Sequence, residues 1–211
     1  MAVRVLAGVV GFLVVGNLLI LGAHLWLQRN ASAGPDVPIN NFAVVDDRLW
    51  RGAAPQDTGY RALADNGVTT VIDLRAEDDI KVDEVKLRDM GITRFHLPQR
   101  DGQAPTPDMV ERFLRIVESS PGRVYVHCGA GVGRTGTMAA AYLVEADGLS
   151  SVEAVKRNLA VGPPSLEQIA FASRLKPGST TVTKAPVPVV AISRVLDAPR
   201  RFWVGVRHSY Q

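Results

Sequence analysis

The chain has 211 residues, of which 46% are apolar, and this size suits one folded domain with additional segments. Residues 29–177 hold 18 Lys and Arg against 20 Asp and Glu, so the net charge of +3 comes mainly from residues 178–211 and argues against a uniformly basic nucleic-acid binder. The single cysteine excludes an internal disulfide.

The chain opens with an apolar segment. Residues 5–27 carry no formally charged side chain, and as a helix they would extend about 35 Å, enough for a hydrocarbon core of about 30 Å. We therefore expect residues 1–27 to form a transmembrane anchor and residues 28–41 a polar linker. A cleaved signal peptide is the alternative, because Ala31-Ser32-Ala33 has the small-x-small form of a cleavage site. Either signal favours a folded domain outside the cytoplasm, in the periplasm.

Strand and helix patterns alternate over residues 42–176, which we expect to form the domain. Apolar or β-branched runs predict strands at 42–45, 49–51, 69–74, 92–97 and 123–127. Amphipathic or capped segments predict helices at 56–66, 77–90, 106–119, 134–146, 150–159 and 163–175. This alternation predicts an α/β fold in which helices flank a central, mostly parallel sheet.

The carboxyl-terminal segment differs in composition from the domain. Residues 177–190 have the appearance of an extended linker, and the residues after them combine arginines with two aromatic side chains. We expect residues 177–211 to be a basic, flexible tail. A patch that binds a membrane surface or a partner is the alternative.

The stretch HCGAGVGRTG, residues 127–136, lies between a predicted strand and a predicted helix. A nucleotide P-loop requires G-x-x-x-x-G-K-[ST], and no lysine lies here. Gly131, Gly133 and Gly136 match the dinucleotide fingerprint G-x-G-x-x-G, but a capped helix follows where that motif needs a strand with an acidic end. Both nucleotide interpretations are therefore weak.

A third interpretation uses every residue of the stretch. Glycines allow the backbone to curl so that successive N–H groups point inward and bind an anion. The helix N-terminus adds positive potential, which stabilises a thiolate at Cys128. Arg134 offers a planar fork to two phosphate oxygens. These residues predict attack of a Cys128 thiolate on phosphorus, through a covalent phosphocysteine.

This pattern resembles the H-C-x5-R-[ST] motif of the cysteine-dependent protein tyrosine phosphatase superfamily. The stretches FAVVDDRLWRGAAP, GVTTVIDLR and GITRFHLP extend the resemblance over roughly residues 42–175. These stretches are similar to those of small bacterial dual-specificity-type phosphatases. The absence of long inserts favours the same branch of the superfamily. The resemblance implies a dual-specificity phosphatase-like fold that needs no cofactor and no metal.

The resemblance also implies the role of each motif residue. Cys128 is the nucleophile, Thr135 hydrogen-bonds its sulfur and helps it leave, and His127 supports the loop and the thiolate. The phosphoryl group is bound by Gly129, Ala130, Gly131, Val132, Gly133 and Arg134.

The leaving oxygen needs a proton from a carboxylic acid that faces the loop. Asp101 is the first candidate, because LPQRDGQAP resembles the D-x-x-x-P acid loop of the superfamily. Asp73 lies inside a predicted strand and Asp108 in the first turn of a predicted helix, where structural roles account for them. Arg100 and Gln103 either touch the substrate or belong to a solvated loop face.

We therefore expect a phosphomonoester hydrolase that acts on phosphotyrosine and, to a lesser degree, on phosphoserine or phosphothreonine of proteins. An inositol-phosphate or phospholipid phosphatase is the alternative, and the lack of lysine in the loop GAGVG disfavours it. A phosphate-binding pseudoenzyme is disfavoured because all three catalytic groups are present. The expected partners are a phosphorylated protein or a small phosphomonoester, and a membrane through residues 5–27, with no nucleic acid.

Overall fold

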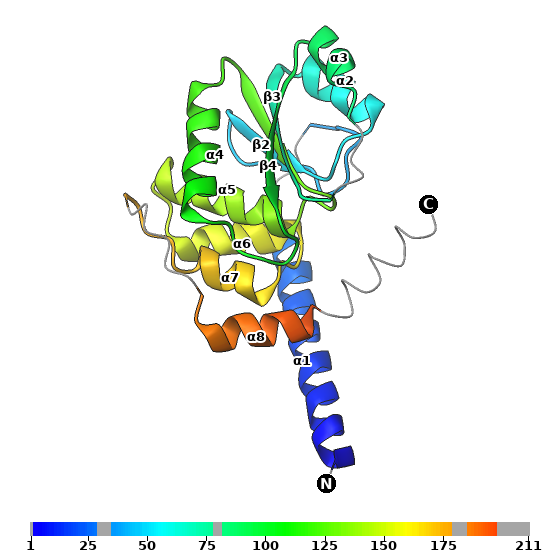
Figure 1. The fold of residues 1–211 in the computed structure, drawn as a ribbon, viewed down its shortest axis with the longest axis vertical. Helices are drawn as coiled ribbons and strands as arrows, with labels where there is room; N and C mark the ends of the chain where they lie inside the picture. The colour runs from blue at the N-terminus through cyan, green and yellow to red at the C-terminus, as the bar shows by residue number, and fades with distance from the viewer. Residues whose placement is uncertain (1, 29–34, 78–81, 179–184, 198–211) are drawn as a thin grey trace.

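The computed structural model describes residues 2–28, 35–77, 82–178 and 185–197. Within these residues one sheet has the strand order β1-β2-β5-β3-β4 (Figure 1). Strands β2, β5, β3 and β4 run parallel to one another, and the edge strand β1 is antiparallel to β2. The predicted mostly parallel sheet is therefore confirmed. The strands are β1 (Ala43–Val44), β2 (Leu49–Gly52), β3 (Val68–Arg75), β4 (Thr93–Gln99) and β5 (Arg123–His127).

Helices cover both faces of this sheet (Figure 1). Helices α2 (Asp57–Asp65) and α3 (Glu84–Asp89) lie on one face. The other face carries α4 (Pro107–Ser119), α5 (Gly133–Glu145), α6 (Ser151–Val161) and α7 (Leu166–Ala172). Because neighbouring residues of a strand point to opposite faces, the sheet separates two apolar cores. Leu49 of β2 lies in the core beneath α4 and α5, whereas Trp50 lies in the core beneath α2 and α3.

Side-chain caps set several helix starts where the sequence places them. Thr106 accepts a hydrogen bond from the backbone N–H of Met109 at the start of α4, and Ser150 accepts one from Glu153 at the start of α6. Helix α7 starts later than the predicted residue 163, because Ser165 and Gln168 form a capping box.

The helix predicted over residues 77–90 is wrong for its first part. Helix α3 begins at Glu84, and the Asp83 side chain accepts from the N–H of Lys86 as its N-cap. A carboxylate favours this capping position over a helix interior. Residues 78–81 lie outside the described residues. Glu77, just before them, contacts the candidate site.

The amino-terminal segment forms helix α1 (Ala2–Gln28), which extends away from the sheet (Figure 1). It lies against α6, and Nδ1 of His24 is 2.8 Å from the carbonyl oxygen of Leu159. None of the helices within the four described ranges is long and apolar enough to cross a membrane. The predicted transmembrane helix is thus not found among these residues. The residues of the predicted cleavage site, 31–33, lie outside them.

The expectation of an extended, flexible tail is corrected for residues 187–196. They form helix α8 (Val187–Leu196), which packs against α7. Ser193 is fully buried, and its Oγ accepts from the backbone N–H of Glu167 at 3.0 Å and donates to Oδ2 of Asp197 at 3.1 Å. Residues 179–184 and 198–211, with the basic and aromatic part of the tail, lie outside the described residues.

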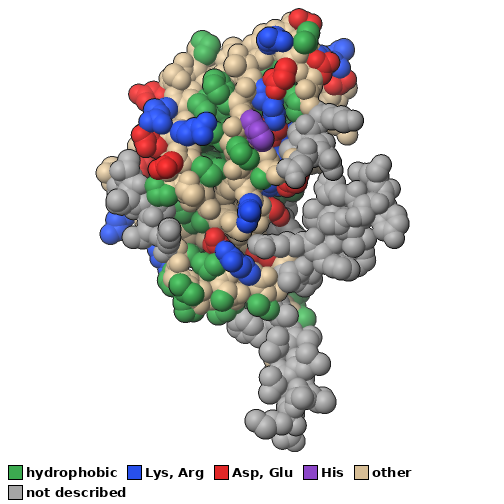
Figure 2. All heavy atoms as spheres, in the orientation of Figure 1, with side chains coloured by type: hydrophobic (Ala, Val, Ile, Leu, Met, Phe, Trp, Pro, Cys, Tyr) green, Lys and Arg blue, Asp and Glu red, His purple; other side chains and the backbone are tan. Residues whose placement is uncertain are grey.

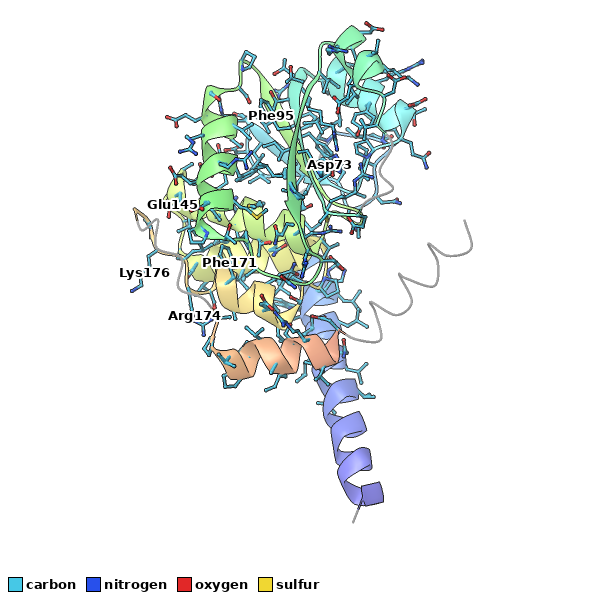
Figure 3. The ribbon with its side chains drawn as sticks, in the orientation of Figure 1. Asp73, Phe95, Glu145, Phe171, Arg174 and Lys176 are labelled. Carbon is cyan, nitrogen blue, oxygen red and sulfur yellow. The ribbon has the colours of Figure 1, made fainter. Side chains whose placement is uncertain are left out.

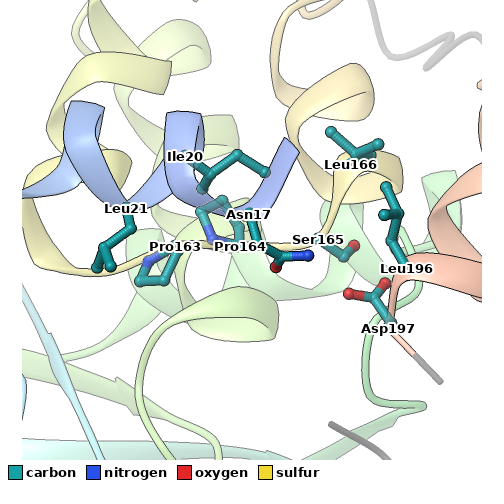
Figure 4. Close-up of a pocket in the computed structure, with 9 residues that line it drawn as sticks. All are labelled: Asn17, Ile20, Leu21, Pro163, Pro164, Ser165, Leu166, Leu196 and Asp197. Carbon is teal, nitrogen blue, oxygen red and sulfur yellow. The ribbon is translucent and has the colours of Figure 1, made fainter. Parts of the chain in front are cut away.

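A pocket lies between α1, the loop before α7 and the end of α8 (Figure 4). It lies apart from the loop over residues 127–136. Its lining residues are Asn17, Ile20, Leu21, Pro163, Pro164, Ser165, Leu166, Leu196 and Asp197.

Charged side chains of both signs are interspersed on the visible face (Figure 2). Arg94 shows how they pair, because its guanidinium contacts Glu84 and Asp73, each at 2.8 Å. This mixture agrees with the near balance of positive and negative residues in the domain.

Candidate active site

The glycine-rich loop connects the central strand β5 to the N-terminus of α5. Cys128 follows the last residue of β5 and is 2% exposed. Gly131 has φ +75°, and a Cβ at this position would collide with the backbone of Gly52. Only glycine satisfies both the left-handed conformation and the close approach of β2.

The backbone of the loop faces the cysteine sulfur. The N–H of Gly131 donates to Sγ of Cys128 at 3.3 Å. Helix α5 begins at Gly133, so its positive N-terminal end lies a few residues from the sulfur. The loop can therefore stabilise negative charge on sulfur and on a bound anion.

Arg134 lies in the first turn of α5, with 5% of its side chain exposed. Glu77 holds its guanidinium through both carboxylate oxygens, at 3.1 Å to Nη1 and 3.0 Å to Nη2. Nη1 also donates to the carbonyl oxygen of Gln99 at 3.1 Å. Burial alone lowers the pKa of Arg134, but the bonds to Glu77 and the charges of Cys128 and Asp101 raise it above its usual value. Arg134 is therefore a permanent cation.

Asp101 reaches the same place from the loop between β4 and α4. Its Oδ1 is 3.4 Å from Nε of Arg134, and 41% of its side chain is exposed. The structure thus brings together Cys128, Arg134 and Asp101. This arrangement offers a nucleophile, a cation and a carboxyl group around a site for one tetrahedral anion.

The comparisons with known proteins agree with this arrangement. Residues 46–148 match the family model of a polymorphic toxin system DSP-PTPase phosphatase. The human dual specificity protein phosphatase CDC14C is 34% identical over 113 residues, which are 51% of this chain and 25% of the relative. Over residues 46–148 the chain belongs to the cysteine-dependent protein tyrosine phosphatase superfamily. It spans about a quarter of the length of the human relative.

Two solved structures show the same fold as this chain. The structure of PTPMT1 in complex with PI(5)P has a TM-score of 0.56 at 23% identity, and the match covers 64% of this chain and 93% of that one. The core catalytic domain of the PP-IP phosphatase SIW14 from S. cerevisiae has a TM-score of 0.57 at 18% identity, and the match covers 64% and 85%. At these identities the likeness supports the fold alone.

The loop that carries Asp101, between β4 and α4, is anchored to the start of α7. Ser165 Oγ donates to the carbonyl oxygen of Gly102 at 2.8 Å, and Glu167 Oε1 accepts from the N–H of Ala104 at 3.1 Å. The Gln103 carbonyl accepts from the side chains of Gln99 and Gln168. These bonds hold the loop that carries Asp101. Arg100 is exposed, and the Gln103 side chain is half-buried.

His127 lies beneath the loop and is fully buried. Its Nδ1 is 3.3 Å from the carbonyl oxygen of Cys128, and its ring stacks on Tyr125 with centroids 5.9 Å apart. Burial lowers the pKa of His127 to about 4, so the imidazole is neutral at neutral pH. A neutral ring that contacts the Cys128 carbonyl is compatible with a supporting role.

Thr135 is fully buried at the start of α5. Its Oγ1 has no hydrogen-bond partner among the described residues, so the expected bond to the sulfur of Cys128 is not formed in this structure. The neighbouring Thr137 bonds the carbonyl oxygens of Gly133 and Arg134. Of these two buried hydroxyls, only that of Thr137 is hydrogen-bonded to the described residues.

The other two candidate acids have structural roles. Asp73 lies on β3 in the interior of the sheet (Figure 3), is fully buried and contacts Arg75 and Arg94, each at 2.8 Å. Burial alone would raise the pKa of Asp73, but these arginines and His127 lower it well below its usual range. A carboxyl that remains ionised cannot donate a proton. Asp108 is exposed in the first turn of α4.

Sequence reasoning misses Glu77 as a site residue, because the pattern predicts it as the first residue of a helix. Burial raises the pKa of Glu77, but the bonds from Arg134 outweigh burial and leave the pKa below its usual value. Its sequence position was the available signal: it lies two residues after β3, at the edge of a parallel sheet where sites form.

Proposed function

We propose that this phosphatase hydrolyses phosphomonoesters through a phosphocysteine. The Cys128 thiolate attacks phosphorus, so that an Sγ–P bond forms and the bond to the leaving oxygen breaks. Asp101 gives its proton to that oxygen. Water then gives a proton to the Asp101 carboxylate and attacks phosphorus, the Sγ–P bond breaks with Thr135 assisting the sulfur, and inorganic phosphate leaves the restored thiolate.

Arg134 and the loop amides of residues 129–133 bind the phosphoryl oxygens in this proposal. The observation that carries it is the position of Asp101, 3.4 Å from Arg134 in the same site as Cys128. The cation that binds the phosphoryl group and the acid that protonates its ester oxygen must both contact the phosphate that the nucleophile attacks.

Substitution of the nucleophile tests the mechanism. We expect Cys128→Ser to abolish turnover while the protein still binds inorganic phosphate, because the loop amides and Arg134 remain. Arg134→Lys should lose nearly all activity, because an ammonium cannot bond two oxygens as a fork does. Full activity of either variant would exclude the phosphocysteine.

Chelation is a second test of the same proposal. Among the described residues, no group of three or more His, Cys, Asp or Glu side chains could hold a metal ion. We expect wild-type turnover to be insensitive to EDTA. Strong inhibition that added metal reverses would indicate a different mechanism.

For the substrate we propose phosphotyrosine, with lesser activity on phosphoserine and phosphothreonine of proteins. The loop residues 129–133 contain no lysine, and the exposed carboxylates at its mouth, Glu77 and Asp101, repel additional phosphate groups. The human relative is named as a dual specificity protein phosphatase.

An inositol-phosphate or phospholipid substrate is the second candidate. It is suggested by two proteins that share the fold, PTPMT1 in complex with PI(5)P and the PP-IP phosphatase SIW14. Comparing kcat/KM on a phosphotyrosyl peptide, a phosphoseryl peptide and inositol hexakisphosphate separates the two. A preference for the inositol phosphate would overturn the protein-substrate proposal.

The location outside the cytoplasm is a separate proposal, supported by the apolar stretch over residues 5–27. It does not rest on a membrane-spanning helix, since none is found among the described residues. Alkaline phosphatase fused after Gln211 should be active and a reporter that works only in the cytoplasm inactive. The opposite pattern would place the domain in the cytoplasm. Fractionation of the cell shows whether the exported chain stays with membranes.

A further inference from the structure

We call the loop between β5 and α5, residues 128–132, the phosphate loop. Four consecutive carbonyl groups of this loop accept hydrogen bonds from one segment, residues 41–54. The backbone N–H of Ala54 donates to Gly129 O at 3.0 Å, and Asn41 Nδ2 donates to Ala130 O at 2.9 Å. Arg51 Nη2 donates to Gly131 O at 2.9 Å and to Val132 O at 3.2 Å.

These bonds determine where the loop N–H groups point. In a trans peptide, the carbonyl of one residue and the N–H of the next point in opposite directions. Carbonyls drawn toward residues 41–54 therefore turn the N–H groups of residues 130–133 away from that segment. The N–H of Gly131, whose preceding carbonyl is held by Asn41, donates to Cys128 Sγ at 3.3 Å. The bonds from outside thus direct the amides toward the nucleophile.

Arg51 differs from an ordinary buried arginine, because it is 3% exposed and forms no ion pair with a carboxylate among the described residues. Its third bond, from Nη1 to Oδ1 of Asn158 at 3.1 Å, is to a neutral amide. Burial lowers the pKa of Arg51 to about 10, although the charge of Cys128 opposes this, so it stays charged at neutral pH. A buried cation without a carboxylate is costly unless it serves an anion.

We propose that Arg51 and Asn41 are positioning residues of the phosphate loop, which hold its carbonyls outward so that its amides face the sulfur and the phosphoryl oxygens. Arg51 acts at Gly131 and Val132, and Asn41 acts at Ala130. This inference rests on the proposed function of the loop and adds two residues that do not themselves touch the substrate. A guanidinium suits the task at Arg51 because one nitrogen can bond two adjacent carbonyls.

The matched control for Arg51 is Arg48, in the same amino-terminal part of the domain. Its guanidinium also donates to backbone carbonyls, those of Val117, Glu118 and Ser120, but these lie at the end of α4. Replacing either arginine by lysine keeps the charge and removes the fork. Arg48→Lys therefore measures the general loss of stability that an arginine-to-lysine change causes. Any further effect in Arg51→Lys comes from the phosphate loop.

Two readouts separate positioning from mere stability. The inhibition constant of inorganic phosphate should rise roughly tenfold to hundredfold in Arg51→Lys, the size expected for losing hydrogen bonds to a charged group, and stay unchanged in Arg48→Lys. Cys128 is the only cysteine, so alkylation by iodoacetamide reports it alone. The alkylation rate of Cys128 at a fixed pH should fall in Arg51→Lys only. A folded Arg51→Lys protein that matches Arg48→Lys in both readouts would overturn the proposal.

Asn41 decides the question if Arg51→Lys does not fold, because Asn41 is exposed. Its φ is +53°, which glycine also adopts, so Asn41→Gly removes the amide without backbone strain. Asn40→Gly is the control, since Asn40 bonds Ala53 through its backbone carbonyl, which the substitution keeps. We expect roughly threefold to tenfold weaker phosphate inhibition in Asn41→Gly alone. Equal inhibition in the two glycine variants would overturn the proposal.

Failure of this inference differs from failure of the proposed function. Direct phosphate binding and alkylation of Cys128 need no turnover. If wild-type protein binds phosphate but hydrolyses no ester, the proposed function fails while weaker phosphate binding by Arg51→Lys and Asn41→Gly still supports the positioning role. If turnover needs Cys128 but both variants behave as their controls do, only the positioning role fails.

Discussion

Asp101 lies beside Arg134, with 3.4 Å between Oδ1 of the carboxylate and Nε of the guanidinium. Asp101 comes from the loop between β4 and α4 and Arg134 from the first turn of α5, and Glu77 occupies the opposite edge of the same guanidinium. Arg134 therefore presents its Nε side to the space that Asp101 shares with Cys128. A phosphoryl group bound there would have its ester oxygen near the carboxyl group of Asp101.

We expect Asp101→Asn to lower kcat for a phosphotyrosyl peptide by roughly 10²–10⁴-fold, the usual size of a general-acid contribution. KM should change little, because the group acts on the leaving oxygen in the transition state. The alkaline limb of the pH–rate profile should flatten, and the loss should shrink for aryl phosphates with good leaving groups.

Asp108→Asn is the control for Asp101→Asn, since Asp108 is exposed in the first turn of α4. It should keep near wild-type kcat. If Asp101→Asn suffers equally with good and poor leaving groups, the acid is another residue.

Glu77→Gln should weaken substrate binding through Arg134. The substitution removes the charge that pairs with both terminal nitrogens of the guanidinium, and leaves the bond to the Gln99 carbonyl. We expect KM to rise roughly threefold to tenfold, a modest effect because 44% of the Glu77 side chain is exposed. Glu84→Gln, which loses an exposed bond to Arg94, should leave KM unchanged. Unchanged KM in both variants would mean that Glu77 does not orient Arg134.

Gly136→Ala should destabilise the protein, although alanine is the better helix former. A Cβ on Gly136 would collide with the side-chain amide of Asn158, the residue that also holds Arg51. We expect the free energy of unfolding, measured with urea, to fall by roughly 1–3 kcal/mol. Gly22→Ala in α1, where the added Cβ meets no neighbour, should cause no loss. Equal stability of both variants would show that α6 shifts to accept the methyl group.

His127 should make folding stability depend on pH between about 6.5 and 4. Burial lowers the pKa of His127 from 6.5 to about 4 in the folded state, so in this range the unfolded chain binds a proton that the folded chain does not. Stability from the neutral ring is therefore complete above pH 6.5 and is lost as the pH falls toward 4, by roughly 3 kcal/mol.

Urea unfolding at several pH values checks this, with His127→Gln and the exposed His96→Gln as the pair of variants. Only His127→Gln should flatten the profile in that window. If the free energy of unfolding of His127→Gln depends on pH as steeply as that of the wild type, other groups cause the pH dependence.

Local signals predicted much of the fold. Runs of β-branched and apolar residues placed β3, β4 and β5, and Thr106 and Ser150 marked helix starts, because these preferences act within a few residues. The prediction failed at residues 77, 82 and 83, before the shorter helix that Asp83 caps, and over residues 187–196, where α8 forms. The contact that packs Ser193 against α7 is with Glu167, 26 residues away, so no local pattern indicates it.

The sequence alone determined which residues the loop contains and predicted its chemistry, because the cysteine, the glycines and the arginine lie at fixed spacing in one short stretch. Only the tertiary structure decided what holds that loop. Glu77 is 57 residues from Arg134, and Arg51 is 80 residues from Gly131. Partners at such separations meet only because β2 and β3 flank β5 on either side and bring their carboxyl ends to one edge of the sheet. Pairing between distant strands depends on the whole core, which no local pattern encodes.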